Sequence, residues 1–563
     1  MRGLSLYLSG LVFLVVLWAA PSAQAAVPDA IYGAKAMVVS AHPEATRIGL
    51  EILKEGGNAV DAAVGVAYAL SVVEPFSSGI GGGSFTLYRE SKEGKVYALD
   101  GREIAPAALK TRNFHPNGKY DPKLSRWTGL AVGVPGLVSA MHALHEKFGS
   151  RPIETILQRV VEVARKGMVV TPRFAARIKR QESYFSVGAQ KVFMVQGRAP
   201  EIGSILKQED QANVIERIAK EGPGAFYEGE IAQKIVEEVG AHGGVMVMDD
   251  MKSYKPRWRE PIRGTWKGMS VFSFPPPSSG GAVLVRLLNG VGEGANLKAS
   301  GWNSSGTVHV LAEIMKRAYA DRNLLLGDPD FVDVPLEQFV DPEIGRKDRE
   351  AIGKRATPAK KVLDRKKLIR EKSHTSHFSI VDSAGNAVSQ TQTINLSFGS
   401  GLLAEGTGIV LNNEVDDFAT APGKQNAFGL VQGVVNEVSP GKRPLSSMTP
   451  TILEKDGRVE AVVGSPGGSF IITSVFQVIL NRYIYGMTAS EAVCMPRFHH
   501  QWLPDYIQAE RYALSADTAL SLAKKKHVIH ERERFGNVQA IFRFENGWHG
   551  AADCRGEGQA MGY

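Results

Sequence analysis

The chain has 563 residues, of which 44% are hydrophobic and 22% charged, the composition of an ordinary globular protein. Its formal net charge is +8, but residues 346–374 alone contain twelve Lys or Arg and four Asp or Glu and carry the whole excess. A nucleic-acid-binding protein would spread basic residues over a folded face. We therefore expect no nucleic-acid partner, and interpret this run as a solvated, partly mobile segment.

The N-terminus predicts an export signal. Arg2 supplies a short positive region, an almost uninterrupted apolar run follows over 4–20, and Pro21 and the small residues of 23–25 suit a cleavage site. We expect residues 1–25 to be a signal peptide and the protein to be exported, either periplasmic or secreted. The alternative is an uncleaved anchor helix, because the apolar run is nearly long enough to span a membrane. No second stretch of that length follows in the sequence, so no stable membrane anchor is expected.

Residues 27–110 have the mixed pattern of an α/β region. Helices are predicted from Pro43 to Glu55 and over the Ala- and Val-rich GGNAVDAAVGVAYALSVVEP, which suits a buried helix. The Gly-rich run SSGIGGGSF, residues 77–85, contains neither GK[ST] nor GxGxxG, so we expect a close-packed backbone turn rather than a phosphate-binding loop. Residues 135–245 are mostly helical by periodicity, and HVLAEIMKRAYADR, residues 309–322, predicts an amphipathic helix.

A β-rich region begins abruptly at Thr375, directly after the basic run. HTSHFSIV predicts a half-buried strand, the turn cluster DSAGN and the run AVSQTQTIN follow, and together they indicate a hairpin. With Ala384 at its centre, facing residues have numbers that sum to 768, twice 384, so Thr375 lies opposite Thr393 and Asn395 lies just beyond. A slip of one residue would reverse the faces, and β-branched residues that simply fill a strand would give the same pattern.

The chain contains two cysteines, Cys494 and Cys554. Export permits a disulfide, but the sequence leaves open whether these two are bridged or remain free thiols. The adjacent His499 and His500 would point to opposite faces of a strand. Joint metal chelation by these histidines is therefore not expected.

Ten motifs, in order along the chain, together resemble those of the γ-glutamyltranspeptidases. Upstream of the hairpin they are GGNAVDAA, LDGREIAPA, FPPPSSGG and YADRNLLLGDPDF. From the hairpin onward they are TSHFSIVD (375–382), T-x-N (393–395), NNEVDDF (412–418), GKRPLSSMTPTI (441–452), GSPGGS (464–469) and PRFHHQWLPD (496–505). The resemblance covers nearly the whole mature chain.

That family belongs to the N-terminal nucleophile hydrolases, so the resemblance implies an α+β fold, a four-layer αββα sandwich formed by intertwined subunits. Family members are made as one proenzyme that cuts itself immediately before a threonine. By resemblance the cut falls between His374 and Thr375, giving a heterodimer of a large subunit, 26–374, and a small subunit, 375–563. The abrupt start of the strand at Thr375 would then be the start of a mature chain.

A threonine hydroxyl needs a base beside it to act as a nucleophile. In the precursor, Thr375 Oγ1 would attack the carbonyl carbon of His374, and water would hydrolyse the resulting ester. The freed α-amino group has an ordinary pKa of about 7.7–8.0, so part of it is neutral near pH 7–8 and can accept the hydroxyl proton. The resemblance makes Thr393 a hydrogen-bonding partner that helps to hold and activate Thr375.

A γ-glutamyl group carries a free α-carboxylate and an α-ammonium, so a selective site needs a cationic fork and anionic acceptors. The family match assigns the carboxylate to Arg102, Ser446 and Ser447. It assigns the ammonium to Asn395, Glu414 and Asp417. Gly467 and Gly468, which precede the apolar helix SFIITSVFQVIL, match the oxyanion hole.

The resemblance implies that Thr375 is acylated by the γ-glutamyl group of glutathione or a related amide, and that water or an amino acid or dipeptide then resolves the ester. It requires no metal and no organic cofactor. Residues 419–440 fill the place of the family's lid loop, with Phe428 where many bacterial members have tyrosine, and Glu414 stands where some members have Gln. After the cut, we expect Lys366 to His374 to be poorly ordered.

Two other interpretations stay open. One is a β-lactam side-chain acylase of the same superfamily, against which the complete set of head-group residues and the lid-length insert argue. The other is an inert, uncut binding protein descended from the enzyme, which would give a single band near 60 kDa on a denaturing gel.

Overall fold

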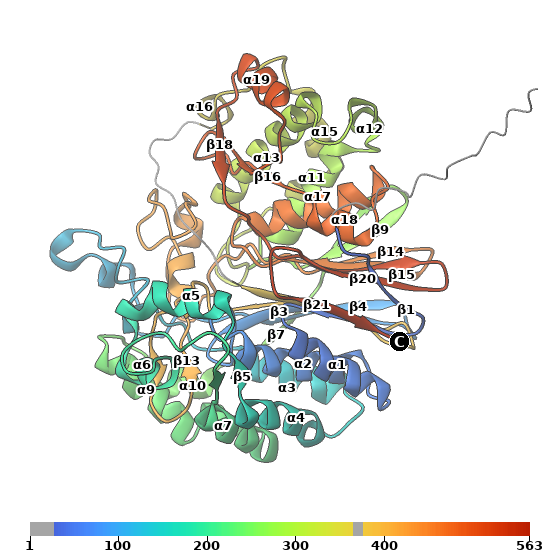
Figure 1. Ribbon diagram of the computed structural model, residues 1–563. Coiled ribbons are helices and arrows are strands. Elements are labelled where there is room, and N and C mark those ends of the chain that lie inside the picture. Colours follow the sequence, from blue (N-terminus) through green and yellow to red (C-terminus); the bar gives the residue numbers. More distant parts are fainter. Residues whose placement is uncertain (1–26, 364–374) are drawn as a thin grey trace, which may run out of the picture.

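The computed structural model describes residues 27–363 and 375–563 (Figure 1). Two seven-stranded sheets form its centre, which we call sheets I and II. Sheet I has the strand order β1 (Ile31–Gly33), β20 (Gly547–Ala552), β19 (Gln539–Phe544), β15 (Arg458–Gly464), β14 (Thr451–Lys455), β9 (Met269–Ser273), β8 (Ile262–Trp266). Sheet II has the order β21 (Gln559–Gly562), β2 (Met37–Ser40), β10 (Ser376–Val381), β11 (Ala387–Thr393), β3 (Gly83–Glu90), β4 (Lys95–Gly101), β7 (Arg257–Arg259). The predicted signal peptide and His374 lie outside the described residues.

The two sheets lie face to face, and helices cover both outer faces (Figure 1). The layer on sheet II contains α1 (Pro43–Lys54), α2 (Ala59–Val73), α3 (Leu137–Phe148), α4 (Ile153–Lys166) and α7 (Glu209–Glu221). The layer on sheet I contains α11 (Gly280–Val291), α13 (Ser305–Leu325), α15 (Pro342–Glu350), α17 (Phe470–Tyr483) and α18 (Ala489–Cys494). Between the sheets, buried side chains such as Phe85, Val381 and Ile541 form a third core. The predicted αββα sandwich is confirmed.

Smaller elements connect and flank these four layers. The helices are α5 (Pro172–Gln181), α6 (Val187–Phe193), α8 (Gly224–Tyr227), α9 (Glu230–Ala241), α10 (Met248–Ser253), α12 (Ala295–Ser300), α14 (Leu336–Val340), α16 (Ala359–Val362) and α19 (Ala516–Lys524). The strands are β5 (Met168–Val169), β6 (Ile205–Leu206), β12 (Leu403–Ala404), β13 (Ile409–Val410), β16 (Phe498–His499), β17 (Ile507–Glu510) and β18 (Ile529–Arg532).

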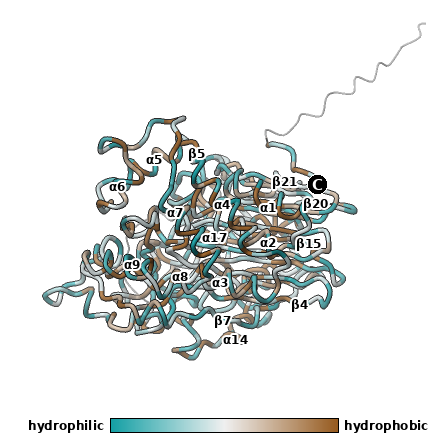
Figure 2. Tube along the Cα trace, turned by 90° about the horizontal axis from the view of Figure 1, so that it is seen from below, coloured by the Kyte–Doolittle hydropathy of each residue, from teal (hydrophilic) through white to brown (hydrophobic). Residues whose placement is uncertain are grey.

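The helices differ in their pattern of hydrophobic residues because some are fully buried and others are partly exposed to solvent. All fifteen residues of α2 are buried, as its small apolar side chains predict, and its N-terminus is closed by a capping box between Asn58 and Asp61. The outer helix α4 instead has one buried hydrophobic face, which includes Ile156, Val160 and Ala164, and its trace in Figure 2 carries both hydrophobic and hydrophilic colours. Among the described residues, no helix combines the length and the apolar character needed to cross a membrane.

Each sheet draws strands from both sides of residue 374. Sheet II takes β2, β3, β4 and β7 from the earlier part of the chain and β10, β11 and β21 from the later part. Sheet I likewise combines β1, β8 and β9 with β14, β15, β19 and β20. The two parts of the chain therefore share both sheets and the three hydrophobic cores that lie on and between them.

The hairpin has the predicted register. Ser376 pairs with Gln392 and Val381 with Ala387, so paired numbers sum to 768 as expected. The strand is not half-buried, however, because all six residues of β10 are buried. Helices cover one face of sheet II and sheet I covers the other, so neither face meets solvent.

The Gly-rich run forms the close-packed turn that its composition indicated, just before β3. A Cβ atom built on Gly82 would lie 2.0 Å from the carbonyl oxygen of Thr393, and one on Gly81 would lie 2.2 Å from that of Val410. Because side chains cannot fit there, glycine lets this turn pack directly against the end of β11.

The basic run 346–374 was predicted to be solvated and partly mobile. Most of its described residues, 346–363, are exposed as predicted, but they form regular structure held by contacts to the rest of the protein. This part continues α15 and forms α16, and Asp348 is paired with Arg286. The backbone N–H of Ala359 donates to Asp505 Oδ2 at 2.7 Å, and its carbonyl accepts from Trp502 Nε1 at 3.1 Å. Lys366 to His374, predicted to be poorly ordered, lie outside the described residues.

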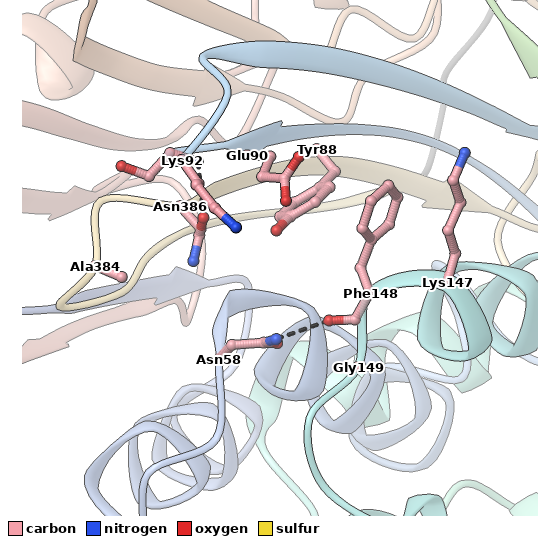
Figure 3. Close-up of a pocket in the computed structure, with 10 residues that line it drawn as sticks. Asn58, Tyr88, Glu90, Lys92, Lys147, Phe148, Gly149, Ala384 and Asn386 are labelled. Atoms are coloured by element: carbon pink, nitrogen blue, oxygen red, sulfur yellow. Dashed lines mark hydrogen bonds between the residues drawn. The ribbon is translucent and has the colours of Figure 1, made fainter.

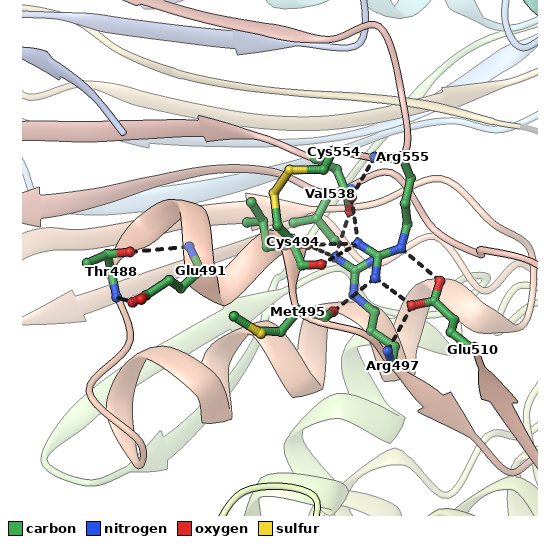
Figure 4. The surroundings of a disulfide bond; sticks show 11 residues. Thr488, Glu491, Cys494, Met495, Arg497, Glu510, Val538, Cys554 and Arg555 are labelled. Atoms are coloured by element: carbon green, nitrogen blue, oxygen red, sulfur yellow. Dashed lines mark hydrogen bonds and ion pairs between the residues drawn. A yellow bond between two sulfur atoms is a disulfide. The ribbon is translucent and has the colours of Figure 1, made fainter. Parts of the chain in front are cut away.

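Cys494 and Cys554 form a disulfide, with Cα atoms 5.4 Å apart across a sequence separation of 60 residues. The bridge joins the end of α18 to the segment after β20 (Figure 4). Beside it, Arg555 is paired with Glu510 and Asp553, and Asp553 also pairs with Arg497. The alternative of free thiols is thus excluded.

Candidate active site

A small cavity lies where the hairpin β10–β11 ends. Its lining brings together residues from segments more than 300 positions apart in the sequence: Arg102, Arg322, Thr375, Thr393, Asn395, Glu414, Asp417, Phe428, Leu430, Leu445, Ser446, Ser447, Met448, Gly468 and Ile471. Nine of the ten residues assigned from the sequence to catalysis or substrate binding are among them. The tenth, Gly467, adjoins Gly468 but does not line the cavity.

Thr375 and Thr393 lie opposite each other at the open end of the hairpin. The distance between their hydroxyl oxygens is 3.4 Å, and both residues are buried. Thr393 Oγ1 also accepts a hydrogen bond from the backbone N–H of Asn395 at 2.7 Å. Either hydroxyl of the Thr375–Thr393 pair can be the donor to the other.

Arg102 lies at the centre of a buried charge cluster. Its Nη2 pairs with Asp417 Oδ2 at 2.7 Å, its Nη1 pairs with Glu414, and Glu103 Oε2 lies 3.8 Å from Nη1. Nε donates to the carbonyl oxygen of Pro444 at 3.2 Å, which fixes the orientation of the guanidinium. All four charged side chains are buried.

The surroundings of Arg102 shift several pKa values in opposite directions. Burial raises the pKa of Glu414 well above its ordinary value and that of Asp417 to about 6, although Arg102 opposes both shifts. Burial alone would lower the pKa of Arg102, but the charges of Glu414, Asp417 and Glu103 outweigh it and raise that pKa. Arg102 therefore keeps its charge. Its charge only partly offsets the cost of burying the ionised carboxylates of Glu414 and Asp417.

Two acceptor atoms at the cavity have no hydrogen-bond partner among the described residues, Asn395 Oδ1 and Glu414 Oε2. Asn395 has a φ of +74°, a left-handed conformation that asparagine tolerates better than most residues. Its Nδ2 donates to the carbonyl of Asn413 at 2.8 Å, which orients the side chain. Buried acceptors left unpaired are costly, so these oxygens are suited to receive a ligand with N–H donors.

Ser446 and Ser447 are held by the rigid loop FPPPSSGG. The N–H of Ser446 donates to the carbonyl of Pro277 at 2.8 Å, and the carbonyl of Ser446 accepts from both the N–H and the hydroxyl of Ser279, at 2.8 and 2.7 Å. Both serines line the cavity beside Arg102 and Arg322. Ser447 Oγ accepts from Arg322 Nη2 at 3.0 Å, and Ser446 Oγ accepts from the N–H of Met448 at 3.1 Å.

Gly467 and Gly468 form the turn that leads into α17, with φ values of +136° and +54°. Both lie in the region that favours glycine. Their carbonyls accept from the N–H groups of Phe470 and Ile471, at 3.1 Å each, which starts the helix. No described residue accepts a hydrogen bond from the N–H of either glycine, so both donors are available at the N-terminus of α17.

A family model described as gamma-glutamyltranspeptidase matches residues 45–563. The chain is 42% identical over 525 residues to the glutathione hydrolase proenzyme of Escherichia coli (strain K12), covering 92% of this chain and 90% of that one. It is 41% identical over 523 residues to the glutathione hydrolase proenzyme of Pseudomonas aeruginosa, covering 92% of each chain. The chain belongs to the gamma-glutamyltranspeptidase family.

Solved structures agree with this assignment. The crystal structure of a cephalosporin acylase from Bacillus halodurans matches with a TM-score of 0.84 at 28% identity, covering 98% of this chain and 99% of that one. The gamma-glutamyltranspeptidase of Helicobacter pylori matches with a TM-score of 0.55 at 35% identity, covering 59% of this chain and 94% of the solved chain. The chain is thus an enzyme of this family with the N-terminal nucleophile hydrolase fold.

One residue of this family member's cavity, Arg322, was missed by the sequence analysis. Its side chain is fully buried and donates to Ser279 Oγ and to Ser447 Oγ, each at 3.0 Å, and to Asn323 Oδ1 at 2.9 Å. Burial lowers its pKa to about 10, so it remains a cation at neutral pH. Arg322 lies in the motif YADRNLLLGDPDF, which was matched to the family. Helical periodicity alone, however, does not reveal which polar residue of α13 faces a cavity.

Two residues of the predicted lid segment 419–440, Phe428 and Leu430, line the cavity. Asn426 Nδ2 donates to Asp417 Oδ1 at 3.2 Å, and the N–H of Ala427 donates to Asp416 Oδ2 at 2.7 Å. The lid is therefore fastened to the same acidic segment that surrounds Arg102.

His499 and His500 both bond within the protein. His499 contacts Thr473 Oγ1 and Gln501 Oε1, each at 2.8 Å, and His500 Nδ1 accepts from the N–H of Trp502 at 3.1 Å. Among residues 27–363 and 375–563 there is no cluster of three or more side chains that could hold a metal ion.

A second, more open hollow lies at the other end of the hairpin, between its turn and α3 (Figure 3). Asn58 donates from its amide to the carbonyl of Phe148 at 2.7 Å, and Tyr88, Ala384 and Asn386 also line the hollow. It contains none of the residues assigned to catalysis, so the cavity beside Thr375 is the candidate active site.

Proposed function

We propose that this chain is an exported, self-cleaving gamma-glutamyltransferase and glutathione hydrolase whose nucleophile is Thr375. The observation that carries the proposal is the cavity itself. A buried threonine hydroxyl with a second hydroxyl 3.4 Å away lies in one small cavity with a buried arginine and two partly uncompensated carboxylates. This is the set of groups that an acyl donor with a free amino-acid head would need.

We infer that the precursor cuts between His374 and Thr375. Thr375 Oγ1 attacks the carbonyl carbon of His374, the amide C–N bond breaks as the amine takes up a proton, and water hydrolyses the ester. The curated relatives named above are proenzymes, which supports such a cut. The solved Helicobacter pylori chain, which matches 59% of this chain, is further support because it is shorter than the uncut chain.

The donor would be recognised by an exchange of ion pairs. Without a donor, Arg102 is neutralised by Glu414 and Asp417. A γ-glutamyl head brings one carboxylate and one ammonium. The carboxylate can form an ion pair with Arg102, and the ammonium can form ion pairs with Glu414 and Asp417 in place of the arginine. Asn395 Oδ1 and Glu414 Oε2 then gain the donors that they lack. Ser446, Ser447 and Arg322 would complete the carboxylate site.

Acyl transfer then uses Thr375 alone as nucleophile and base. Its free α-amino group accepts the hydroxyl proton, Oγ1 forms an ester with the γ-carbonyl carbon, and the leaving amine takes the proton. The N–H groups of Gly467 and Gly468 would stabilise the oxyanion, since an oriented donor at a helix N-terminus is worth several kcal/mol. Water or the amino group of an amino acid or dipeptide then attacks the ester and releases Thr375.

Export is proposed from the sequence of residues 1–25, and an exported enzyme would act in the periplasm or outside the cell. The partners of the processed enzyme are then glutathione or other γ-glutamyl compounds as donors, and small amines as acceptors. The large and small subunits remain together as a heterodimer because they share both sheets.

The test compares the wild-type chain with Thr375→Ala. The wild type should give two bands on a denaturing gel, with the smaller chain beginning at Thr375 by amino-terminal sequencing, and should release p-nitroaniline from γ-glutamyl-p-nitroanilide. Thr375→Ala should remain one chain without activity. An active protein that stays a single chain would refute the mechanism. Preference for a glutaryl-cephalosporin over the γ-glutamyl amide would favour the acylase function that the Bacillus halodurans neighbour has by name.

A further inference from the structure

We propose that Gln501 is a positioning residue that ties the lid to the turn Gly467–Ser469, so that one side-chain amide holds the cavity closed and the start of α17 in place. Gln501 lies in the motif PRFHHQWLPD, which the proposed chemistry does not use. The geometric part stands on the contacts below, and its effect on acyl transfer rests on the proposed function.

The two ends of the Gln501 amide bind different parts of the site. Nε2 donates to the carbonyls of Phe428 and Gly429 in the lid, at 3.2 and 3.3 Å. Oε1 accepts from Ser469 Oγ at 2.7 Å and contacts His499 Nε2 at 2.8 Å. The side chain is buried, with 2% of its surface exposed, so water does not replace these bonds.

The surrounding groups determine which way the amide points. Two backbone carbonyls can only accept, so the NH₂ group must face Phe428 and Gly429 and the oxygen must face Ser469 and His499. His499 must therefore carry its proton on Nε2, which leaves Nδ1 to accept from Thr473 Oγ1 at 2.8 Å. Burial lowers the pKa of His499 to about 3, so this arrangement persists across the neutral range.

The other bonds of this part of the lid are internal or run to the acidic segment. The N–H groups of Phe428 and Leu430 both donate to Asn426 Oδ1, at 3.0 and 3.2 Å, and Asn426 Nδ2 donates to Asp417. Between Asn426 and Leu430, Gln501 supplies hydrogen bonds that cross from the lid towards α17. Further along the lid, the N–H of Gly433 donates to the carbonyl of Asn323 in α13 at 3.0 Å. Phe428 and Leu430 line the cavity, so Gln501 restrains the segment that covers Thr375.

On the other side, Gln501 helps to fix the residue that follows the two glycines. Ser469 is the N-cap of α17, its hydroxyl donates to Gln501, and its carbonyl accepts from the hydroxyl of Tyr319. Movement of Gln501 would therefore alter lid closure and the position of the Gly467 and Gly468 donors together. Phe428 and Leu430 of the lid line the same cavity as Thr375, so Gln501 would also influence how water or an acceptor amine resolves the ester.

The test measures lid opening by proteolysis, which requires no catalytic activity. Lys424 is exposed in the lid, and Lys92 is exposed between β3 and β4, beside the hollow at the other end of the hairpin. In Gln501→Glu the carboxylate still accepts from Ser469 but cannot donate to the two lid carbonyls. We expect trypsin to cut after Lys424 at least tenfold faster than in the wild type, with cleavage after Lys92 unchanged.

Two further variants define the controls. Gln501→Met, which removes the donors without adding charge, should show the same selective cleavage at Lys424 and covers the case in which Gln501→Glu fails to fold. Ser469→Ala keeps the lid side of the amide and should cut at Lys424 within twofold of the wild type. Cleavage at Lys424 that stays at the wild-type rate in both Gln501 variants, or rises equally at Lys92, overturns the proposal.

A kinetic readout separates positioning from general damage. If Gln501 restrains the lid, Gln501→Glu should lower the ratio of transfer to hydrolysis measured with γ-glutamyl-p-nitroanilide and glycylglycine, because water enters an open cavity more readily than a dipeptide is held in it. An unchanged ratio would overturn the effect on acyl transfer. If the chain proves inactive on γ-glutamyl amides, the proposed function fails while the proteolysis result still decides the role of Gln501.

Discussion

Replacing Arg102 by lysine should weaken recognition of the donor's α-carboxylate while leaving acyl transfer intact. The guanidinium is oriented by Pro444 and presents both Nη atoms to Glu414 and Asp417, a fork that matches a carboxylate. Lysine keeps the positive charge needed beside the three acidic side chains but offers a single point of contact. The variant should therefore fold and cut itself.

The expected loss follows from the geometry. One of two charge-assisted hydrogen bonds disappears, and such a bond is worth about 1.5–3 kcal/mol. At about 1.36 kcal/mol per tenfold, kcat/KM for γ-glutamyl-p-nitroanilide should fall by about 10- to 150-fold. The carboxylate lies away from the reacting carbon and is held equally in the ground state and the transition state, so the loss should appear mainly in KM.

A second donor distinguishes recognition from damage. 4-Aminobutyryl-p-nitroanilide has the same acyl chain and ammonium but no α-carboxylate. The wild type should use it poorly, and Arg102→Lys should use it about as well as the wild type does. If the variant loses the same factor on both donors, Arg102 does not read the carboxylate and the reasoning is refuted.

Three further predictions concern stability. Burial raises the pKa of Glu74 to about 7 from 4.5, so the native protein holds that proton more tightly than the unfolded chain, and stability is lost as pH rises through 4.5–7. Glu74→Gln should therefore raise the thermal midpoint more at pH 8 than at pH 5, and an equal change at both would contradict this. The double variant Cys494→Ser, Cys554→Ser should lose about 4 kcal/mol of unfolding free energy, measured in urea on the uncut chain. Gly82→Ala should lower both the thermal midpoint and the activity, because a Cβ at residue 82 would lie 2.0 Å from the carbonyl oxygen of Thr393. Gly224→Ala is the control and should change neither, because no atom lies within 4 Å of a Cβ at that position.

Local rules predicted the hairpin well because its register depends on neighbours in sequence. The turn DSAGN fixes which residues face each other, so the approach of Thr375 and Thr393 followed from counting. The assignment of Arg102, Glu414 and Asp417 came from the family resemblance instead. No local pattern indicates that residues more than 300 positions apart meet in one ion-pair cluster.

The errors have a common cause. The basic run was judged by its charge, yet the segment around Ala359 is held by Trp502 and Asp505, which lie more than 140 positions later. Arg322 and Gln501 were overlooked because their roles depend on what faces them across the cavity. The cysteines were left undecided because pairing depends on how α18 lies against the end of β20.

Because each sheet contains strands from both fragments, folding and cutting of the chain must occur in a fixed order. Neither fragment contains all the strands of either sheet, so neither should fold by itself. The precursor must therefore reach its native fold before the cut. A cut enzyme that has been unfolded by heat would have to reassemble from two separate polypeptides. That step is bimolecular, whereas the precursor folds as a single chain. Thermal inactivation should thus be irreversible after the cut and reversible before it.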